Sequence, residues 1–166
     1  IITLQLKLSN SWTNFNLIFH ELEATYSQCI FEDDKVEIHT IPLDHRVYTN
    51  GFLFKEKPFD RKLLLENAKA KNIDVAYYRK LKQGDDVYNS DGVLIKNTEV
   101  TTDGRTPKHY AFCSDTAYSE AIIPIIQGVD AMYHESTFLE DHAALCAKTK
   151  HSTAKQAATI ANKARV

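Results

Sequence analysis

The stretch HYAFCSDTAYSEAIIPIIQGVDAMYH, residues 109–134, decides the predicted fold class. It opens with a short apolar run at 109–113, continues through an apolar segment near 118–127 that has the length of a helix, and closes with a second short run at 129–134. Pro124 must kink or split the helical segment, because proline lacks a backbone N–H and its ring clashes with the preceding turn. A strand, a helix and another strand in succession are typical of an α/β protein.

The segments on either side predict further helices and strands. A helix is expected near 139–148, and a last helix begins after Thr153, because Thr153 and Gln156 have the spacing of a capping box. Upstream, runs of β type lie at 17–22, 26–31, 36–43 and 51–55. The alternation near the C-terminus and the meander before it together predict one mixed sheet.

Two shorter features complete the predicted organisation. Apolar residues at near-helical spacing within 1–12 predict a helix. The Asp91-Gly92 turn joins two short runs, 87–88 and 93–95, and this arrangement predicts a β-hairpin.

Residues 55–82 differ in charge from the rest of the chain. They hold nine Lys and Arg against four Asp and Glu, a net charge of +5, whereas the whole chain carries −2. Leu63 and Ala68 indicate a short amphipathic helix in this segment, with Asp60 at its N-cap. By itself, such a basic segment is most simply a solvated helix face.

The composition limits the class of protein. The 166 residues are 43% apolar and 25% charged, which suffices for one globular core and one domain. The net charge of −2 excludes a disordered acidic tail and a globally basic nucleic-acid binder. The five glycines are at least eight residues apart, so GxGxxG and P-loop motifs are absent and no nucleotide cofactor is expected.

Cysteine spacing and hydropathy predict the cellular setting. Cys29, Cys113 and Cys146 contain no CxxC pair, which argues against a disulfide framework or a thiolate zinc cluster and favours a reducing, cytoplasmic location. Apolar runs are too short to span a membrane. Position 1 is Ile rather than Met, so we expect that the chain was processed or cut from a longer protein.

Ionisable side chains follow two predicted strands, where sites tend to form in sheets of this kind. His45 follows the run 36–43, and alone it is most simply an exposed loop residue. Asp115 follows the run 109–113. Either Asp115 or Thr116 caps a helix at this point, or Asp115 is a metal ligand.

Glu135 and His151 also lie at the edges of predicted elements. Glu135 directly follows the run 129–134. His151 precedes the last helix, whose first N–H groups attract an anion such as phosphate. In the simpler interpretation Ser152 or Thr153 caps the helix, and His151 only precedes it.

Four motifs occur in order along the chain: HRVYTNGF (45–52), CSDT (113–116), HESTF (134–138) and HSTAKQAATIA (151–161). Their order and separations resemble those of the ribonuclease Z family, tRNA 3′-processing endonucleases of the metallo-β-lactamase superfamily. The resemblance covers essentially the whole chain.

This resemblance implies a fold, a metal site and a proton donor. The fold would be part of a metallo-β-lactamase αβ/βα sandwich with a mixed sheet. His45 matches a terminal ligand of one zinc ion, and Asp115 matches the carboxylate that bridges two zinc ions, roles that suit imidazole and carboxylate donors. Glu135 and His151 match the pair that donates a proton to the leaving 3′ oxygen, with the carboxylate orienting the imidazole.

The resemblance also implies partners. The substrate would be precursor tRNA, whose 3′ trailer is removed by phosphodiester hydrolysis, and a homodimer is expected. The basic segment at about 55–82 would be a protruding arm that binds the tRNA. Its candidate RNA contacts are Lys69, Lys71, Arg79 and Lys80.

The chain departs from the family pattern in several places. The HxHxDH motif is absent, and so is the last ligand histidine, which implies the C-terminal portion of the enzyme, truncated at both ends. With only His45 and Asp115 as metal ligands, the chain alone is expected to be inactive and to hold zinc poorly. Residues 73–76 lack the Gly-Pro motif of the arm, and Ser136 replaces the usual alanine.

Two other functions stay open. One is a different metal-dependent hydrolase of the superfamily that acts on a small phosphodiester or sulfate ester, for which a basic protrusion has no use. The other is a non-catalytic module that binds RNA or dimerises. An HxHxDH motif in the longer protein would exclude this second function.

Overall fold

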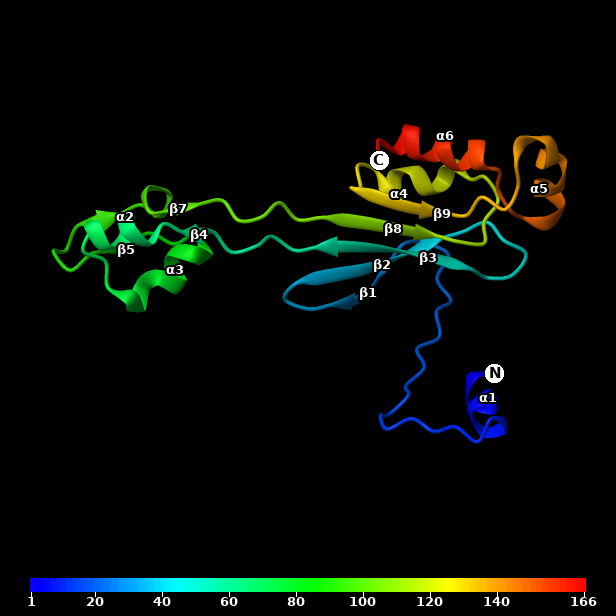
Figure 1. Cartoon of the computed structure of the whole chain (residues 1–166), viewed down its shortest axis with the longest axis horizontal. Helices are drawn as coiled ribbons and strands as arrows, with labels where there is room; N and C mark the ends of the chain where they lie inside the picture. The colour runs from blue at the N-terminus through cyan, green and yellow to red at the C-terminus, as the bar shows by residue number, and fades with distance from the viewer.

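The chain folds into a body and a lobe that are joined by two extended segments (Figure 1). The structure, a computed structural model, describes all residues from 1 to 166. The body holds the larger sheet, and the lobe holds two small ones. No helix is long and apolar enough to cross a membrane.

The body is built on a five-stranded sheet with the order β1-β2-β3-β8-β9. Its strands are β1 (Cys29–Glu32), β2 (Val36–Pro42), β3 (Asn50–Glu56), β8 (His109–Cys113) and β9 (Ala131–His134). Neighbouring strands pair antiparallel except β8 and β9, which pair parallel. The predicted mixed sheet is confirmed.

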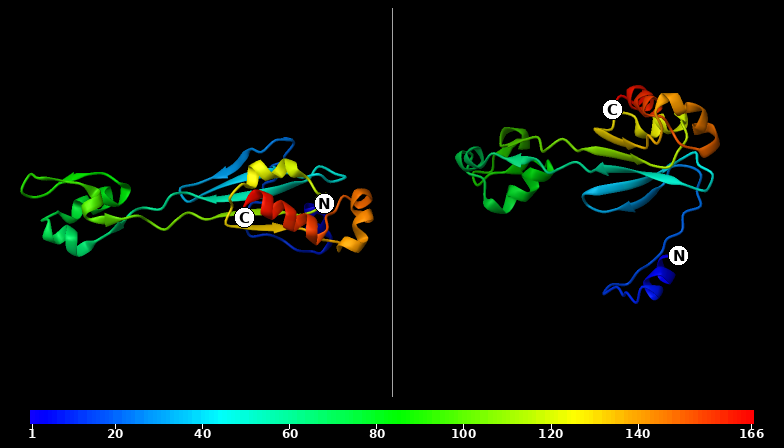
Figure 2. Two further views of the ribbon diagram at one scale, coloured as in Figure 1. Left: turned by 90° about the horizontal axis from the view of Figure 1, so that it is seen from above. Right: turned by 45° about the vertical axis from the view of Figure 1, so that its right-hand side comes forward.

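Helices α4 (Ile123–Ile126) and α6 (Ala154–Ala164) cover one face of this sheet (Figure 2). A 3-10 turn at Glu120–Ile122 precedes α4, and Pro124 lies in the first turn of α4. Proline is tolerated there because the first N–H groups of a helix have no intrahelical partner. The segment near 118–127 is therefore split, as predicted. The core of the body consists of Ile41, Leu53, Ala111, Cys113, Ile122, Ile126, Val129, Ile160 and Ala164.

The opposite face of the sheet carries aromatic side chains. Alternation along β3 and β8 directs Leu53 and Ala111 to the helices and the neighbouring Phe and Tyr residues to the other side. The Phe112 and Tyr133 rings stack with centroids 4.8 Å apart. Tyr133 remains 48% exposed, so within this chain the aromatic face is only partly covered.

The lobe has its own small core. Its helices are α2 (Leu65–Ala70) and α3 (Tyr78–Gln83), with 3-10 turns at Val75–Tyr77 and Asn97–Glu99. Its strand pairs are β4 (Lys62–Leu63) with β7 (Thr101–Thr102), and β5 (Val87–Tyr88) with β6 (Leu94–Ile95). The buried residues are Ala68, Ile73, Leu81, Val87, Ile95 and Val100, so the folded lobe continues beyond the basic segment.

The two extended segments that join the lobe to the body run close together. A Cβ atom on Gly104 would lie 2.5 Å from the carbonyl oxygen of Asp60. Only glycine allows this approach, because any side chain would have to displace backbone.

Several other sequence predictions are confirmed. The hairpin turns at Gly92, which has a φ of 76°. Helix α6 begins with the predicted capping box, in which Thr153 and Gln156 exchange hydrogen bonds. The helix expected near 139–148 is a 3-10 turn at Glu140–His142 followed by α5 (Ala143–Thr149).

Three local predictions are wrong or only partly right. Residues 17–22 form no strand, because no neighbouring strand pairs with them and their apolar side chains are largely exposed. The run 26–31 becomes a strand only from Cys29. In 1–12 the helix is α1 (Ile2–Leu8), which buries no residue.

The helix predicted in the basic segment begins later than expected. Lys62 and Leu63 pair with Thr101 and Thr102 as a strand, so α2 begins only at Leu65. Asp60 is not its N-cap, and its carboxylate instead lies 4.0 Å from Lys82. Strand pairing across the base of the lobe overrides the local helical pattern.

Because the two cores are separate, we expect Leu81→Ala to loosen the lobe and spare the sheet. Leu81 is fully buried, and truncation of such a leucine costs roughly 2–5 kcal/mol. Hydrogen exchange in the full-length protein should accelerate for amides of the lobe and stay unchanged in β2, β3 and β8. Ile160→Ala in the core of the body is the matched control and should show the reverse pattern. Equal acceleration in both parts would contradict two separate cores.

Candidate active site

Four loops meet at one edge of the body sheet. Because β2, β8 and β9 run in the same direction, their carboxyl ends lie at the same edge, where α/β sheets form their sites. The loop after β2 is joined to the loop after β8 by a hydrogen bond from the Ala117 N–H to the Asp44 carbonyl, 2.8 Å. The Ser152 hydroxyl, before α6, donates to the Thr116 carbonyl at 2.7 Å.

Glu135 and His151 form a hydrogen-bonded pair at this edge. The His151 Nδ1 lies 2.8 Å from one carboxylate oxygen of Glu135, which also accepts the Thr116 N–H at 3.2 Å. The other oxygen accepts both the N–H of Thr137, at 3.0 Å, and its hydroxyl, at 2.8 Å. Glu135 is only 7% exposed, so these bonds fix its carboxylate in one orientation.

The pKa of Glu135 reflects two opposing influences. Burial raises the pKa, but hydrogen bonds from Thr137, His151 and the Ser152 backbone outweigh burial, and the pKa lies below its ordinary value. The carboxylate is therefore ionised at neutral pH. Since a carboxylate only accepts hydrogen bonds, Nδ1 of His151 donates, and Nε2 is left to act on another group.

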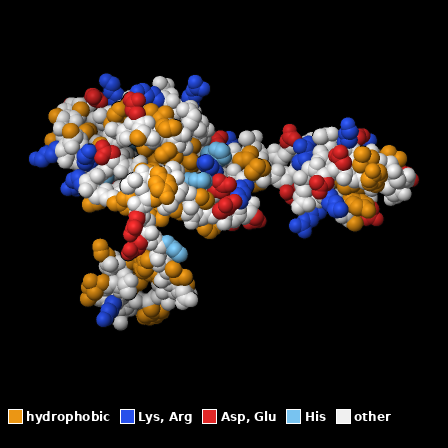
Figure 3. Space-filling view, turned by 180° about the vertical axis from the view of Figure 1, so that it is seen from behind, with side chains coloured by type: hydrophobic (Ala, Val, Ile, Leu, Met, Phe, Trp, Pro, Cys, Tyr) orange, Lys and Arg blue, Asp and Glu red, His pale blue; other side chains and the backbone are white.

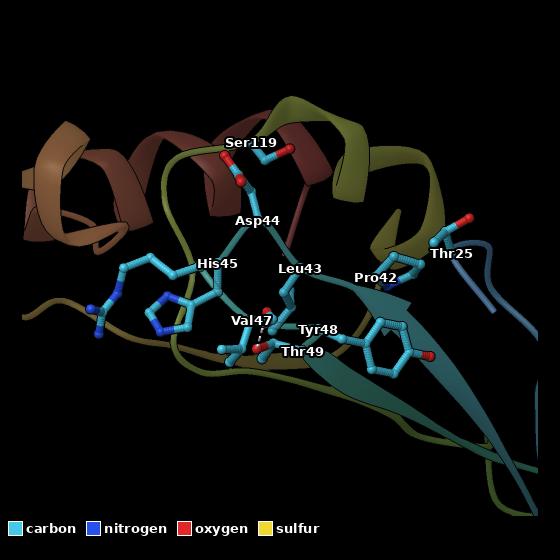
Figure 4. Close-up of a pocket in the computed structure, with 10 residues that line it drawn as sticks. Thr25, Pro42, Leu43, Asp44, His45, Val47, Tyr48, Thr49 and Ser119 are labelled. Atoms are coloured by element: carbon cyan, nitrogen blue, oxygen red, sulfur yellow. Dashed lines mark hydrogen bonds between the residues drawn. The ribbon is translucent and has the colours of Figure 1, made fainter. Parts of the chain in front are cut away.

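His45 lies beside this pair. Its ring centroid is 5.4 Å from that of His151. The His45 Nδ1 lies 3.0 Å from the Lys150 carbonyl, so Nδ1 carries the proton and Nε2 offers a lone pair. A hollow of about 410 Å³ adjoins this loop and is lined mainly by residues 42–49 (Figure 4). His45 is thus part of a hydrogen-bonded site rather than an isolated loop residue.

Asp115 is exposed, and its carboxylate forms no hydrogen bond within the chain. Its backbone is left-handed, with a φ of 47°, an uncommon conformation that aspartate adopts more readily than most residues. No helix begins at this point, so the alternative in which Asp115 or Thr116 caps a helix is excluded. Thr116 instead accepts the Asp44 N–H at 3.2 Å.

The residues at this edge fit part of a metal site. An imidazole with a free Nε2 and a carboxylate without protein partners are donor types that zinc accepts. A backbone carbonyl on the other imidazole nitrogen is also usual for histidine ligands. No group of three or more His, Cys, Asp or Glu side chains in this chain is arranged to hold a metal. His45 and Asp115 are therefore candidate donors that are too few to hold a metal ion by themselves.

Comparison with known proteins shows similarity to one family of enzymes. No family model matches the chain. Ribonuclease Z of Porphyromonas gingivalis strain W83 is 43% identical over 150 residues, which are 90% of this chain and 49% of that protein. Ribonuclease Z of Cytophaga hutchinsonii is 44% identical over 165 residues, or 99% of this chain and 52% of that protein.

Nearly all of the chain is similar to ribonuclease Z. It spans about half the length of the ribonuclease Z proteins that it matches. The structure also resembles the short form of human tRNase Z, with a TM-score of 0.59 and 16% identity over 99% of this chain and 52% of that one. This likeness shows the fold, which is part of a metallo-β-lactamase α/β architecture. The family resemblance and the fold class that the motifs predicted are confirmed, while the roles of individual residues stay predictions.

The four candidate RNA contacts lie on the lobe, away from the ribonuclease Z-like motifs (Figure 1). Lys69 pairs with Glu66 at 3.1 Å, and Lys71 pairs with Glu99 at 2.6 Å. Arg79 and Lys80 are exposed and form no ion pair. Two of the four cations thus have an acidic partner, and two have none.

Residues 57–107 contain ten Lys and Arg and eight Asp and Glu, so the lobe carries a net charge of only +2. Figure 3 shows basic and acidic side chains interspersed on one face of the lobe. The charge of +5 counted in the sequence is diluted because later acidic residues fold into the same lobe.

Sequence reasoning missed two kinds of site residue. Thr137 binds the Glu135 carboxylate through both its N–H and its hydroxyl, and its position two residues after a carboxylate was the only available signal. Asp44 and Lys150 join two loops that are more than 100 residues apart. No local pattern indicates such a distant pair.

The lowered pKa of Glu135 predicts a pH-dependent contribution to stability. A carboxyl group with a depressed folded-state pKa stabilises the fold above its ordinary value of 4.5, and this contribution is lost as the pH falls through the folded-state pKa. Glu135→Gln in the full-length protein should be destabilising at neutral pH, because the amide NH2 would face backbone donors. The difference in unfolding free energy from wild type should shrink as the pH falls below 4.5.

The matched control is Glu66→Gln, whose carboxylate is 84% exposed on the lobe. Chemical denaturation across this pH range measures both variants. A Glu135→Gln difference that does not vary with pH would contradict the ionised, hydrogen-bonded carboxylate.

Proposed function

We propose that this chain is part of a metal-dependent endoribonuclease that removes the 3′ trailer from tRNA precursors by phosphodiester hydrolysis. The similarity to ribonuclease Z, at 43–44% identity over most of the chain, carries the proposal. The geometry supports it, because the Glu135–His151 pair and His45 lie together at the carboxyl edge of the sheet. Such a pair beside a potential metal ligand suits hydrolysis better than binding alone.

His151 is proposed as the proton donor in this reaction. Glu135 orients the imidazole through Nδ1 and stabilises its protonated form, so the Nε2–H is directed at the reacting bond. Water adds to phosphorus as the bond between phosphorus and the 3′ oxygen breaks, and Nε2 gives its proton to that departing oxygen. The tRNA then ends in a 3′-hydroxyl, and the trailer retains the phosphate.

His45 and Asp115 are proposed to hold zinc, with Asp115 shared between two ions. When bound, the metal would supply Lewis-acid stabilisation of charge on the phosphodiester oxygens. The remaining ligands would come from residues outside these 166, and we propose that the chain is the C-terminal portion of its domain. This is consistent with the partial ligand set, and the exposed aromatic face of the sheet is available to pack on the rest of the domain.

The lobe is proposed as an arm that binds the RNA backbone. It projects from the body on two extended segments (Figure 1). It carries Arg79 and Lys80, which are exposed and have no acidic partner. Lys69 and Lys71 are weaker candidates, because contact with phosphate requires each to leave its carboxylate.

The family resemblance also supports a cytoplasmic homodimer as the working assembly.

Asp115→Ala and His151→Ala should separate metal binding from proton donation. In the full-length protein, Asp115→Ala should lose bound zinc and activity together, because a bridging carboxylate contacts both ions. His151→Ala should keep its zinc and slow tRNA precursor cleavage by roughly 10²- to 10⁴-fold, the usual contribution of a general acid. Zinc content and single-turnover rates measure the two effects.

A nitrophenyl phosphodiester provides the control, because its leaving group needs no proton. This substrate should restore much of the rate of His151→Ala and none of the rate of Asp115→Ala. Loss of zinc from His151→Ala would assign His151 to the metal site instead. Absence of tRNA precursor cleavage by the wild-type protein under zinc-replete conditions would overturn the proposed function.

The arm proposal predicts unequal effects of the two pairs of cations. Arg79→Ala with Lys80→Ala should weaken tRNA binding and reduce its salt dependence, because each lost phosphate contact lowers the log-log slope by about 0.7 to 0.9. Lys69→Ala with Lys71→Ala is the matched control and should have the smaller effect. Binding isotherms at several salt concentrations test this prediction. Unchanged affinity in both double variants would show that these basic residues form a solvated surface and do not bind RNA.

A further inference from the structure

Lys150 has an unusual backbone conformation for its residue type. It ends helix α5 with a φ of 60° and a ψ of 44°, in the left-handed region. Glycine usually occupies such a position, because a side chain there crowds the following carbonyl. A lysine at this position places an ammonium group where glycine would place none.

The side chain and the backbone of Lys150 both bind the loop after β2. The ammonium nitrogen lies 3.0 Å from each carboxylate oxygen of Asp44. The carbonyl oxygen of Lys150 accepts the Nδ1–H of His45 at 3.0 Å. One residue thus contacts two consecutive residues that precede it by more than 100 positions in the chain.

These contacts join two histidines of the site. Lys150 directly precedes His151, and its carbonyl contacts His45, whose ring is 5.4 Å from that of His151. The left-handed conformation directs the carbonyl, and the ion pair with Asp44 holds the loop that carries His45 against it. The hydrogen bond and the ion pair therefore hold the same loop, the one that carries His45.

The ion pair itself adds little to global stability. The Lys150 and Asp44 side chains are 38% and 45% exposed. An ion pair that water can reach contributes little to the free energy of unfolding, because water solvates the separated charges almost as well. Its effect is therefore expected on local geometry rather than on the free energy of unfolding.

We propose that Lys150 is a positioning residue, which ties the Asp44–His45 loop to the His151 loop and so sets the tautomer and orientation of the His45 imidazole. This inference rests on the proposed function in one respect: the expected effect on zinc affinity assumes that His45 is a metal ligand. Hydrogen-bond partners of ligand histidines typically change metal affinity by about 10- to 100-fold.

The decisive variant is Lys150→Gly in the full-length protein. Glycine relieves the left-handed strain and removes the ammonium group, so the melting temperature of the metal-free protein should stay equal or rise. Zinc affinity, measured by competition with a chelator, should nevertheless fall by about 10-fold or more. A purely structural role would move both quantities in the same direction.

Two further variants separate the ion pair from the backbone effect. Asp44→Asn removes the same ion pair without changing the backbone at position 150, so it should reproduce the loss of zinc affinity. Combining it with Lys150→Gly should add little. Lys150→Arg keeps the cation and should restore most of the affinity. Unchanged zinc affinity in Lys150→Gly, or no recovery in Lys150→Arg, would overturn the positioning role.

The tautomer of His45 tests the proposal without metal or RNA. In the metal-free wild-type protein, ¹⁵N NMR of the imidazole should show the proton on Nδ1, and Lys150→Gly should show a mixture of tautomers. An identical tautomer in both proteins would also overturn the proposal. If the wild-type protein neither binds zinc nor cleaves tRNA precursors, the proposed function fails, while the NMR result still decides the role of Lys150.

Discussion

A carboxylate that is removed from water needs hydrogen-bond donors, and Glu135 finds them on three separate loops. Thr116 follows β8, Thr137 follows β9, and His151 lies between α5 and α6. Because one charged group requires all these donors, it fixes the distances between the loops at the edge of the sheet. The position of His151, and through it that of His45, depends on this buried charge.

The regular elements of the body could be predicted because their signals are local. A capping box marks the start of α6, Pro124 splits the helix before β9, and Asp91-Gly92 forms the hairpin turn of the lobe. Each signal acts within a few residues, so neighbouring sequence contains it completely. At Lys62–Leu63 the local pattern predicted a helix, but these residues form a strand because they pair with a distant strand.

The sequence indicated which residues make up the candidate site, but not which contacts join them. The motifs supplied His45, Asp115, Glu135 and His151, because functional residues keep their order and spacing in a family. The contacts of Lys150 with Asp44 and His45 could not be predicted from the sequence, because they join residues more than 100 positions apart. The net charge of residues 55–82 does not describe the surface of the lobe for a related reason. Later acidic residues fold into the same lobe, and two of the four candidate cations, Lys69 and Lys71, pair with carboxylates.

The attachment of the lobe has a consequence for how this fold can change. Strands β3 and β8 pair directly, so the chain leaves the sheet after Glu56 and returns to it at His109 in the adjacent strand. The lobe also has a core that shares no residue with the core of the body. An insertion whose two ends are adjacent and whose core is its own can be shortened, exchanged or removed while the sheet remains closed by an ordinary hairpin. The lobe and the candidate site at the edge of the sheet can therefore change independently in a protein built on this plan.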